Sequence, residues 1–162
     1  PLILHCSPSG AIERVIYALL EKEALKIKRG QKPMLPLWLS PTQIRFIPVG
    51  DEFVNNCEKY VDELKNISEF HHIRADIDDR EESVSRKIRD AEKEWIPIII
   101  VVGEKEKIGQ KFTPRFRVES IGDSNKSYSI NELFELIKPK IKGFPQAILP
   151  LSTHLSKRPK FK

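Results

Sequence analysis

The chain has 162 residues, enough for one well-buried domain and part of another. Apolar residues make up 40% of it and charged residues 31%, and no apolar run could cross a bilayer, so composition excludes a disordered or membrane-spanning chain. The net charge of +5 permits a polyanionic partner without requiring one. Cys6 and Cys57 lie far apart in the sequence, which gives no sign of a disulfide framework and favours a reducing, cytoplasmic location.

The first 35 residues predict a strand, a helix and a linker. Residues 2–6 are a short apolar run, which Pro8-Ser9-Gly10 interrupts before apolar residues recur at helical spacing over residues 12–20. One strand and one helix cannot bury their own apolar faces, and the chain begins at Pro1 without an initiator Met. We therefore expect residues 1–35 to be the end of a larger domain. The basic, loop-like residues 21–36 predict a linker that contains the domain boundary.

The sequence after the linker predicts alternating strands and helices. Residues 44–49 are apolar on both faces of a strand, and apolar residues at helical spacing predict helices over residues 53–64 and 84–95. A second strand is expected around residues 72–77, and the β-branched run at 96–102 predicts a buried central strand. Such alternation implies right-handed crossovers and a mostly parallel sheet flanked by helices.

The last third of the chain predicts a hairpin, a helix and a tail. Turn-forming residues at 122–125 separate short mixed strands at 115–120 and 126–130. We therefore expect an α/β domain over residues 36–145, with a mixed, mostly parallel sheet of about five strands. Ser129 and Glu132 form a capping-box pattern ahead of the final helix. Residues 146–162 are basic and contain prolines, and this C-terminal tail is expected to be loosely held.

A cluster of acidic residues after the second strand has two interpretations. Its members are Asp76, Asp78, Asp79, Glu81 and Glu82. They could hold a divalent cation through oxygen ligands, but arginines at positions 74, 80 and 86 lie among them, which favours a solvated loop of mixed charge. Motifs of dinucleotide-binding, P-loop, serine hydrolase and zinc protease sites are absent from the sequence. The α/β domain alone is not an obvious enzyme.

The start of the chain carries a specific motif. Leu-His-Cys-Ser-Pro-Ser-Gly-Ala-Ile-Glu-Arg-Val, at residues 4–15, resembles the third signature of class II aminoacyl-tRNA synthetases. In that family an Arg at the helix start contacts ATP, and the matching residue is Arg14. In threonyl enzymes a His on the preceding strand is one of three zinc ligands, and its spacing from the Arg identifies His5. Without the motif, both residues would be assigned structural or solvated roles.

Two further segments resemble the anticodon-binding domain that threonyl, prolyl, histidyl and glycyl synthetases share. Residues 38–43, Trp-Leu-Ser-Pro-Thr-Gln, are similar to its entry motif, and residues 74–106 are similar to archaeal-type threonyl enzymes. In the threonyl family a helix Arg, an acidic residue after the central strand and an Arg on the next strand meet anticodon bases. The residues that match these by motif are Arg89, Glu106 and Arg115. Two additional candidates, Arg80 and Glu81, lie in the acidic loop. Without the resemblance, ordinary surface ion pairs would be the preferred interpretation of each.

Taken together, the resemblance implies the C-terminal part of an archaeal-type threonyl-tRNA synthetase. The parent enzyme would activate threonine with ATP and Mg²⁺, select it with zinc, and act as a cytoplasmic homodimer joined through its catalytic domains. The present chain is expected to bind threonine tRNA through the anticodon, to hold no cofactor and to be inactive by itself. A stand-alone RNA-binding accessory protein is one alternative. The same region of a prolyl or histidyl synthetase is another, against which the spacing of His5 argues.

Overall fold

A computed structural model describes residues 2–6, 10–67, 73–145 and 147–159 of the chain. The chain forms two compact units, Pro1–Leu35 and Pro36–Lys162. In the described residues, none of the helices has both the length and the apolar character needed to cross a membrane.

The first unit consists of one long helix, α1, over Ile12–Lys28. The strand predicted at residues 2–6 does not form, and the Leu2 and Leu4 side chains are almost fully exposed, because no described residue offers these residues a hydrogen-bonded neighbour. The helix also extends well into the predicted linker. The buried Glu23 carboxylate explains this extension, since it accepts hydrogen bonds from Lys26 Nζ at 2.6 Å and from the Met34 N–H at 2.8 Å.

The second unit is built on a four-stranded sheet with the order β2-β1-β3-β4. The strands are β1 (Ile44–Pro48), β2 (Ala75–Ile77), β3 (Ile98–Val102) and β4 (Arg115–Phe116). β1 pairs in parallel with both β2 and β3, whereas β4 is antiparallel to β3. This topology confirms the predicted α/β class and the mostly parallel sheet. Residues 68–72, which include part of the second predicted strand, lie outside the described residues.

The strand predicted at residues 126–130 is replaced by a single antiparallel bridge between Phe112 and Tyr128, so the described sheet has four strands rather than about five. The reason lies in the turn. The Ser124 hydroxyl, and not a neighbouring strand, accepts the Phe116 N–H at 3.1 Å. Asp123 similarly uses its carboxylate to accept the Asn125 N–H at 2.8 Å. Short polar side chains thus satisfy backbone groups that a hairpin would have paired.

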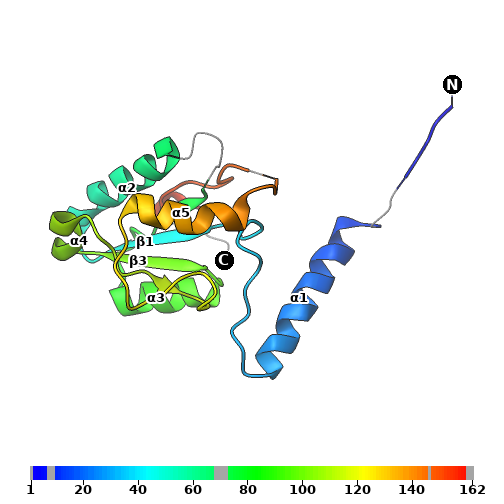
Figure 1. The fold of residues 1–162 in the computed structure, drawn as a ribbon, viewed down its shortest axis with the longest axis horizontal. Helices are drawn as coiled ribbons and strands as arrows, with labels where there is room; N and C mark the ends of the chain where they lie inside the picture. The colour runs from blue at the N-terminus through cyan, green and yellow to red at the C-terminus, as the bar shows by residue number, and fades with distance from the viewer. Residues whose placement is uncertain (1, 7–9, 68–72, 146, 160–162) are drawn as a thin grey trace. The chain divides into compact units, whose positions relative to one another are not determined.

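Helices cover both faces of the sheet. They are α2 (Val54–Ile67, preceded by the 3-10 turn η1 at Asp51–Phe53), α3 (Val84–Lys93), α4 (Glu104–Gly109) and α5 (Ile130–Ile141). Figure 1 shows α2 and α5 on one face, α3 on the opposite face and the short α4, which the sequence analysis did not predict, at one end of the sheet. The predicted capping box of α5 is confirmed, because Ser129 and Glu132 each accept the other's backbone N–H.

Alternation along the strands divides the core between the two faces. Phe46 of β1 packs with Tyr60 and Phe112 on the side of α2, and the last two rings meet edge to face at 4.8 Å. Ile47, the next residue of β1, packs on the side of α3 in a cluster with Ala91 and Ile99. The sheet is therefore covered on both sides, as its nearly continuous apolar strands predicted.

The end of α3 differs from the prediction. Its apolar spacing continues to Trp95, but the helix ends at Lys93 and Trp95 takes a left-handed backbone conformation with φ of 58°. The Trp95 N–H donates to Glu92 O, and the Ile96 N–H donates to Ala91 O at 3.1 Å. These bonds form a Schellman ending, in which glycine is the usual residue at the left-handed position.

The tail is attached to the sheet, contrary to the prediction that it is loosely held. His154 forms a parallel bridge with Ile77 on the outer edge of β2, and the Ile77 N–H donates to Thr153 O at 2.8 Å. Asp79 accepts hydrogen bonds from the backbone N–H and the hydroxyl of Ser156, which lies in the 3-10 turn η2 (Leu155–Lys157). Residues 153–156 therefore pair with β2 where a further strand would have paired.

Candidate functional site

The carboxyl ends of the three parallel strands meet at one edge of the sheet. β1 ends at Pro48, β2 at Ile77 and β3 at Val102, and a helix follows each of them in the chain. Because α2 and α3 lie on opposite faces of the sheet (Figure 1), the connections that follow β1 and β2 diverge there. Open α/β sheets bind ligands in the crevice that such divergence creates. This carboxyl edge is the natural place to look for a site.

Glu106 lies at this edge, in the first turn of α4. One of its carboxylate oxygens, Oε2, accepts the Gly103 N–H at 3.0 Å, and its backbone carbonyl accepts the Tyr60 hydroxyl at 3.3 Å. The side chain is half-buried. These two bonds fix the position of the carboxylate, while its second oxygen has no partner among the described residues and can accept a hydrogen bond from a ligand.

Arg89 lies on α3 and Arg115 lies on β4. Arg115 pairs in register with Ile99, whose side chain packs under α3, so Arg115 projects from that same face of the sheet. Just beyond β4, the backbone N–H of Arg117 donates to Pro97 O. The Arg117 side chain donates from Nη1 to Glu92 O at 2.7 Å, which links this segment to α3. Arg89 precedes Glu92 by one helical turn, and Arg115 precedes Arg117 by two strand residues.

Arg115 thus projects on the side of the sheet that α3 covers, and Arg89 lies on α3 itself, so the two exposed arginines belong to the same side of the domain. Within the residues that the structure describes, neither Arg89 nor Arg115 has an ion pair or a side-chain hydrogen bond. Glu106 is not adjacent to Arg115, because Gly103 at the carboxyl edge lies four positions after Ile99, the residue opposite Arg115, which is roughly 13 Å along a strand. The arrangement offers separate points of contact, which suits an extended ligand better than one small molecule.

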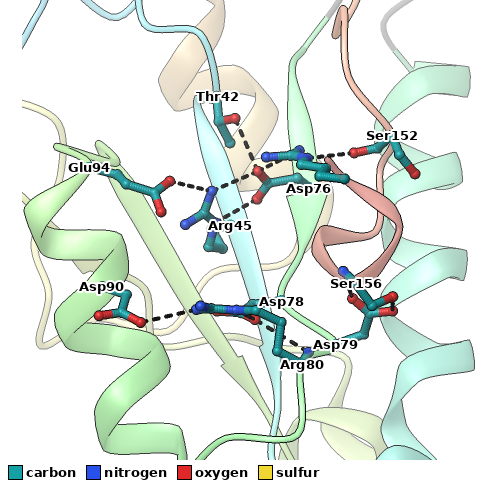
Figure 2. Close-up of polar contacts among 11 residues, drawn as sticks. Thr42, Arg45, Asp76, Asp78, Asp79, Arg80, Asp90, Glu94, Ser152 and Ser156 are labelled. Atoms are coloured by element: carbon teal, nitrogen blue, oxygen red, sulfur yellow. Dashed lines mark hydrogen bonds and ion pairs between the residues drawn. The ribbon is translucent and has the colours of Figure 1, made fainter. Parts of the chain in front are cut away.

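The two additional candidates, Arg80 and Glu81, differ in their availability. Arg80 donates from Nε and Nη2 to both carboxylate oxygens of Asp78, at 2.8 and 2.7 Å, and Nη2 also lies 3.3 Å from Asp90 (Figure 2). The hydrogen bond to Asp78 is the main cause that raises the pKa of Arg80. Its donors are therefore largely used within the protein. Glu81 is exposed and has no ion pair among the described residues.

The acidic segment is not the solvated loop that its mixed charge predicts, because Asp76 and Asp78 are fully buried. Asp76 belongs to a buried charge cluster whose members are Thr42, Arg45, Asp76, Glu94 and Arg158, and Figure 2 labels the first four of them. Arg45, only 1% exposed, donates to both oxygens of Asp76 at 2.8 and 2.9 Å. Burial alone would lower the pKa of Arg45, but its hydrogen bonds to Asp76 and then to Glu94, together with their charges, raise it.

This cluster also holds the tail, because Arg158 donates to Asp76 Oδ2 at 2.9 Å and to Ser152 O at 2.8 Å. The sequence contained a usable signal for its centre. Arg45 and Asp76 are opposite charges inside two apolar strands, at positions that pair directly in the parallel register.

The residues assigned to zinc and ATP lie in the first unit. His5 and Arg14 are both exposed. In the described part of the chain, no group of three or more His, Cys, Asp or Glu side chains is placed to hold a metal ion. His5 could supply at most one ligand, so the described residues do not form a zinc site by themselves.

Comparison with known proteins gives a consistent result. Residues 43–140 match the family described as "Anticodon binding domain". The whole chain is 52% identical to a threonine–tRNA ligase of Pyrococcus horikoshii, and 99% of it aligns at 45% identity with that of Methanocaldococcus jannaschii. It spans about a quarter of the length of these curated relatives, 25% and 26% respectively.

A solved structure shares the fold. The crystal structure of the RNA binding domain of threonyl-tRNA synthetase from Cryptosporidium parvum Iowa II superposes with a TM-score of 0.59 and 23% sequence identity. The alignment covers 85% of the present chain and 30% of that one.

Proposed function

Since this chain belongs to the anticodon binding domain family, we propose that it recognises the anticodon of threonine tRNA as part of a threonine–tRNA ligase. The observation that carries the proposal is that Arg89 and Arg115, on the same side of the domain that matches the family, are exposed and have no ion pair in the described residues. A cationic surface that lacks internal anionic partners favours a polyanionic ligand, and the net charge of +5 agrees with this.

The chemistry of the candidate residues suits single-stranded bases. Anticodon bases are splayed out of the stack, so a protein can contact their hydrogen-bonding edges directly. Arg115 offers a planar fork of donors to carbonyl and ring-nitrogen acceptors on a base. Glu106, with one carboxylate oxygen held by Gly103, can accept from the ring N–H or amino group of a guanine with the other. Arg89 would contact a neighbouring base or phosphate. Glu81 is the better of the two additional candidates because Arg80 is already paired.

The activity of the complete ligase extends this proposal. The parent would join threonine to tRNA with ATP and Mg²⁺, as a cytoplasmic homodimer. Arg14 would contribute a positive charge for ATP, and His5 would contribute one ligand to a zinc ion whose other ligands come from outside the described residues. The bound zinc would act as the Lewis acid that selects threonine. By itself, the present chain is expected to bind tRNA without aminoacylating it.

The test is a binding titration of the 162-residue chain with threonine tRNA. We expect Arg115→Ala to weaken binding by ~1–3 kcal/mol, the scale of one lost bidentate base contact. Arg86→Ala is the matched control, because Arg86 is an exposed arginine on α3 whose side chain is paired with Glu82. Equal loss for Arg115→Ala on a tRNA with altered anticodon bases would show that Arg115 contacts only phosphate. Absence of tRNA binding by the unmodified chain would refute the proposed function.

A further inference from the structure

A polar cavity of about 320 Å³ lies on the α2 and α5 side of the domain, at the carboxyl edge of the sheet. Its wall includes residues from α2, from α4 and its end, and from the start of α5, chiefly Asn56, Lys59, Tyr60, Lys107, Gln110 and Asn131. The volume falls within the roughly 300–1,000 Å³ of typical ligand pockets. The base contacts proposed for Arg89, Arg115 and Glu106 do not use the side chains of this wall.

The wall presents many hydrogen-bonding groups that the protein does not use. Within the described residues, the carboxamides of Asn56, Gln110 and Asn131 have no hydrogen-bond partner. Each carboxamide supplies two donors and one acceptor oxygen, the combination that matches the edge of a nucleobase. Lys59 and Lys107 in the wall carry two positive charges against the single carboxylate of Glu63. Lys107 Nζ also lies 3.8 Å from a carboxylate oxygen of the exposed Glu104, so among the described residues Lys59 is the cation of this wall without an ion pair.

Gln110 lies in this wall at a position that requires a left-handed backbone conformation. Its φ of 48° lies in the left-handed region, which glycine or asparagine occupies more readily, and its N–H donates to Glu106 O at 3.0 Å. The left-handed ending of α4 therefore places a long carboxamide at the cavity.

The cavity adjoins the proposed base-reading edge through α4. Tyr60 in the cavity wall donates its hydroxyl to the backbone carbonyl of Glu106, and Lys107 is the next residue along the same helix. An RNA loop that reaches Glu106 would therefore have an adjacent nucleotide within reach of the cavity.

We propose that this cavity holds one nucleotide of the bound RNA, at a position other than those contacted by Arg115 and Glu106. The carboxamides of Asn56, Gln110 and Asn131 bind the base edge, and Lys59 and Lys107 bind its phosphate. This inference rests on the proposed function, because it takes the ligand to be the same tRNA. The polar wall does not suit an apolar ligand, and its single carboxylate does not suit a divalent cation.

The experiment combines pocket variants with abasic substitutions in an anticodon stem-loop RNA of threonine tRNA. With the 162-residue chain, Asn56→Ala combined with Asn131→Ala should weaken binding about tenfold, the scale of two lost hydrogen bonds. Asn55→Ala is the control, because Asn55 is an exposed carboxamide on the same helix that does not line the cavity. One abasic loop position should cause a similar loss in the unmodified chain and no further loss in the double variant.

Two additional variants test the pocket independently. Gln110→Gly keeps the left-handed backbone while removing the carboxamide, and it should weaken binding a few-fold. Lys107→Gln should reduce the slope of log affinity against log salt by about 0.7, the value for one phosphate contact to a single strand. Thermal unfolding of each variant identifies any loss that comes from the fold.

The outcomes separate the two proposals. If the double variant binds like the unmodified chain while Arg115→Ala binds more weakly, the cavity does not hold a nucleotide and the proposed function stands. If the double variant binds every abasic RNA more weakly than the unmodified chain does, and by the same factor, no base occupies the cavity, and this inference is overturned. If the unmodified chain binds no stem-loop and no tRNA, the proposed function falls with it.

Discussion

Replacing Asp76 with alanine removes the carboxylate at the centre of the buried charge cluster. Three side chains donate to this carboxylate: Arg45 at 2.8 and 2.9 Å, Thr42 at 3.1 Å and Arg158 at 2.9 Å. Without it, Arg45 keeps only Glu94, whose side chain is 52% exposed and therefore a weak partner. A buried guanidinium would be left largely without a compensating charge.

The expected cost follows from this geometry. Removing one partner of a buried ion pair typically destabilises a protein by ~3–5 kcal/mol, because the remaining charge stays buried. Arg45 is 1% exposed, and its Nη1 already has no hydrogen-bond partner among the described residues, so the upper half of that range is expected. A loss of about 4 kcal/mol corresponds to a Tm lower by roughly 8–16 °C in a chain of this size.

Urea unfolding followed by tryptophan fluorescence measures this cost. Asp62→Ala is the matched control, since Asp62 is 66% exposed and its pair with Lys65 at 2.9 Å should contribute less than about 1 kcal/mol. Combining Arg45→Met with Asp76→Leu should recover much of the stability, because it removes both buried charges. If Asp76→Ala costs no more than Asp62→Ala, the cluster does not stabilise the fold as argued.

Two further predictions concern packing and thiol chemistry. Gly122→Ala should destabilise the domain by ~1–3 kcal/mol in the same urea assay, because a Cβ there would lie 2.7 Å from the Phe116 ring and 2.8 Å from Leu136. Gly109→Ala, where a Cβ meets nothing within 4 Å, should be neutral or stabilising by up to ~1 kcal/mol, and equal losses at both positions would contradict this reasoning. Burial raises the pKa of the Cys57 thiol to about 12 although the charge of Lys87 opposes it, so in mildly alkaline buffer iodoacetamide should modify only the exposed Cys6. Mass spectrometry should find one adduct in the native protein and two in urea, and two adducts in the native protein would contradict the burial of Cys57.

Features with a local signal could be predicted from the sequence. The capping box of α5 needs only Ser129 and Glu132, and the central strand β3 needs only its β-branched run. The end of α3 was predicted too late because the signal expected there is glycine, whereas Trp95 takes the left-handed position. Apolar spacing alone does not register that change.

Features that depend on distant partners were not predicted. Asp76 and Arg158 are 82 residues apart, so the local sequence predicts a solvated acidic cluster and a loose basic tail, although Asp76 and Arg158 are partners. Among the candidate site residues, composition could not distinguish Arg80, which forms an ion pair with Asp78, from Arg89 and Arg115, which have no partner in the described residues. Availability for a ligand depends on tertiary contacts, and the one-dimensional pattern does not contain them.

The attachment of residues 153–158 to β2 has a consequence for folding during synthesis. The outer edge of β2 is covered, and the charge of Asp76 is compensated by Arg158, only after the ribosome has made residues about 80 positions beyond β2. Contacts of such long range raise the contact order and slow folding. A nascent chain stalled before residue 153 should therefore leave the outer edge of β2 open, and it should resist protease poorly until Arg158 has emerged.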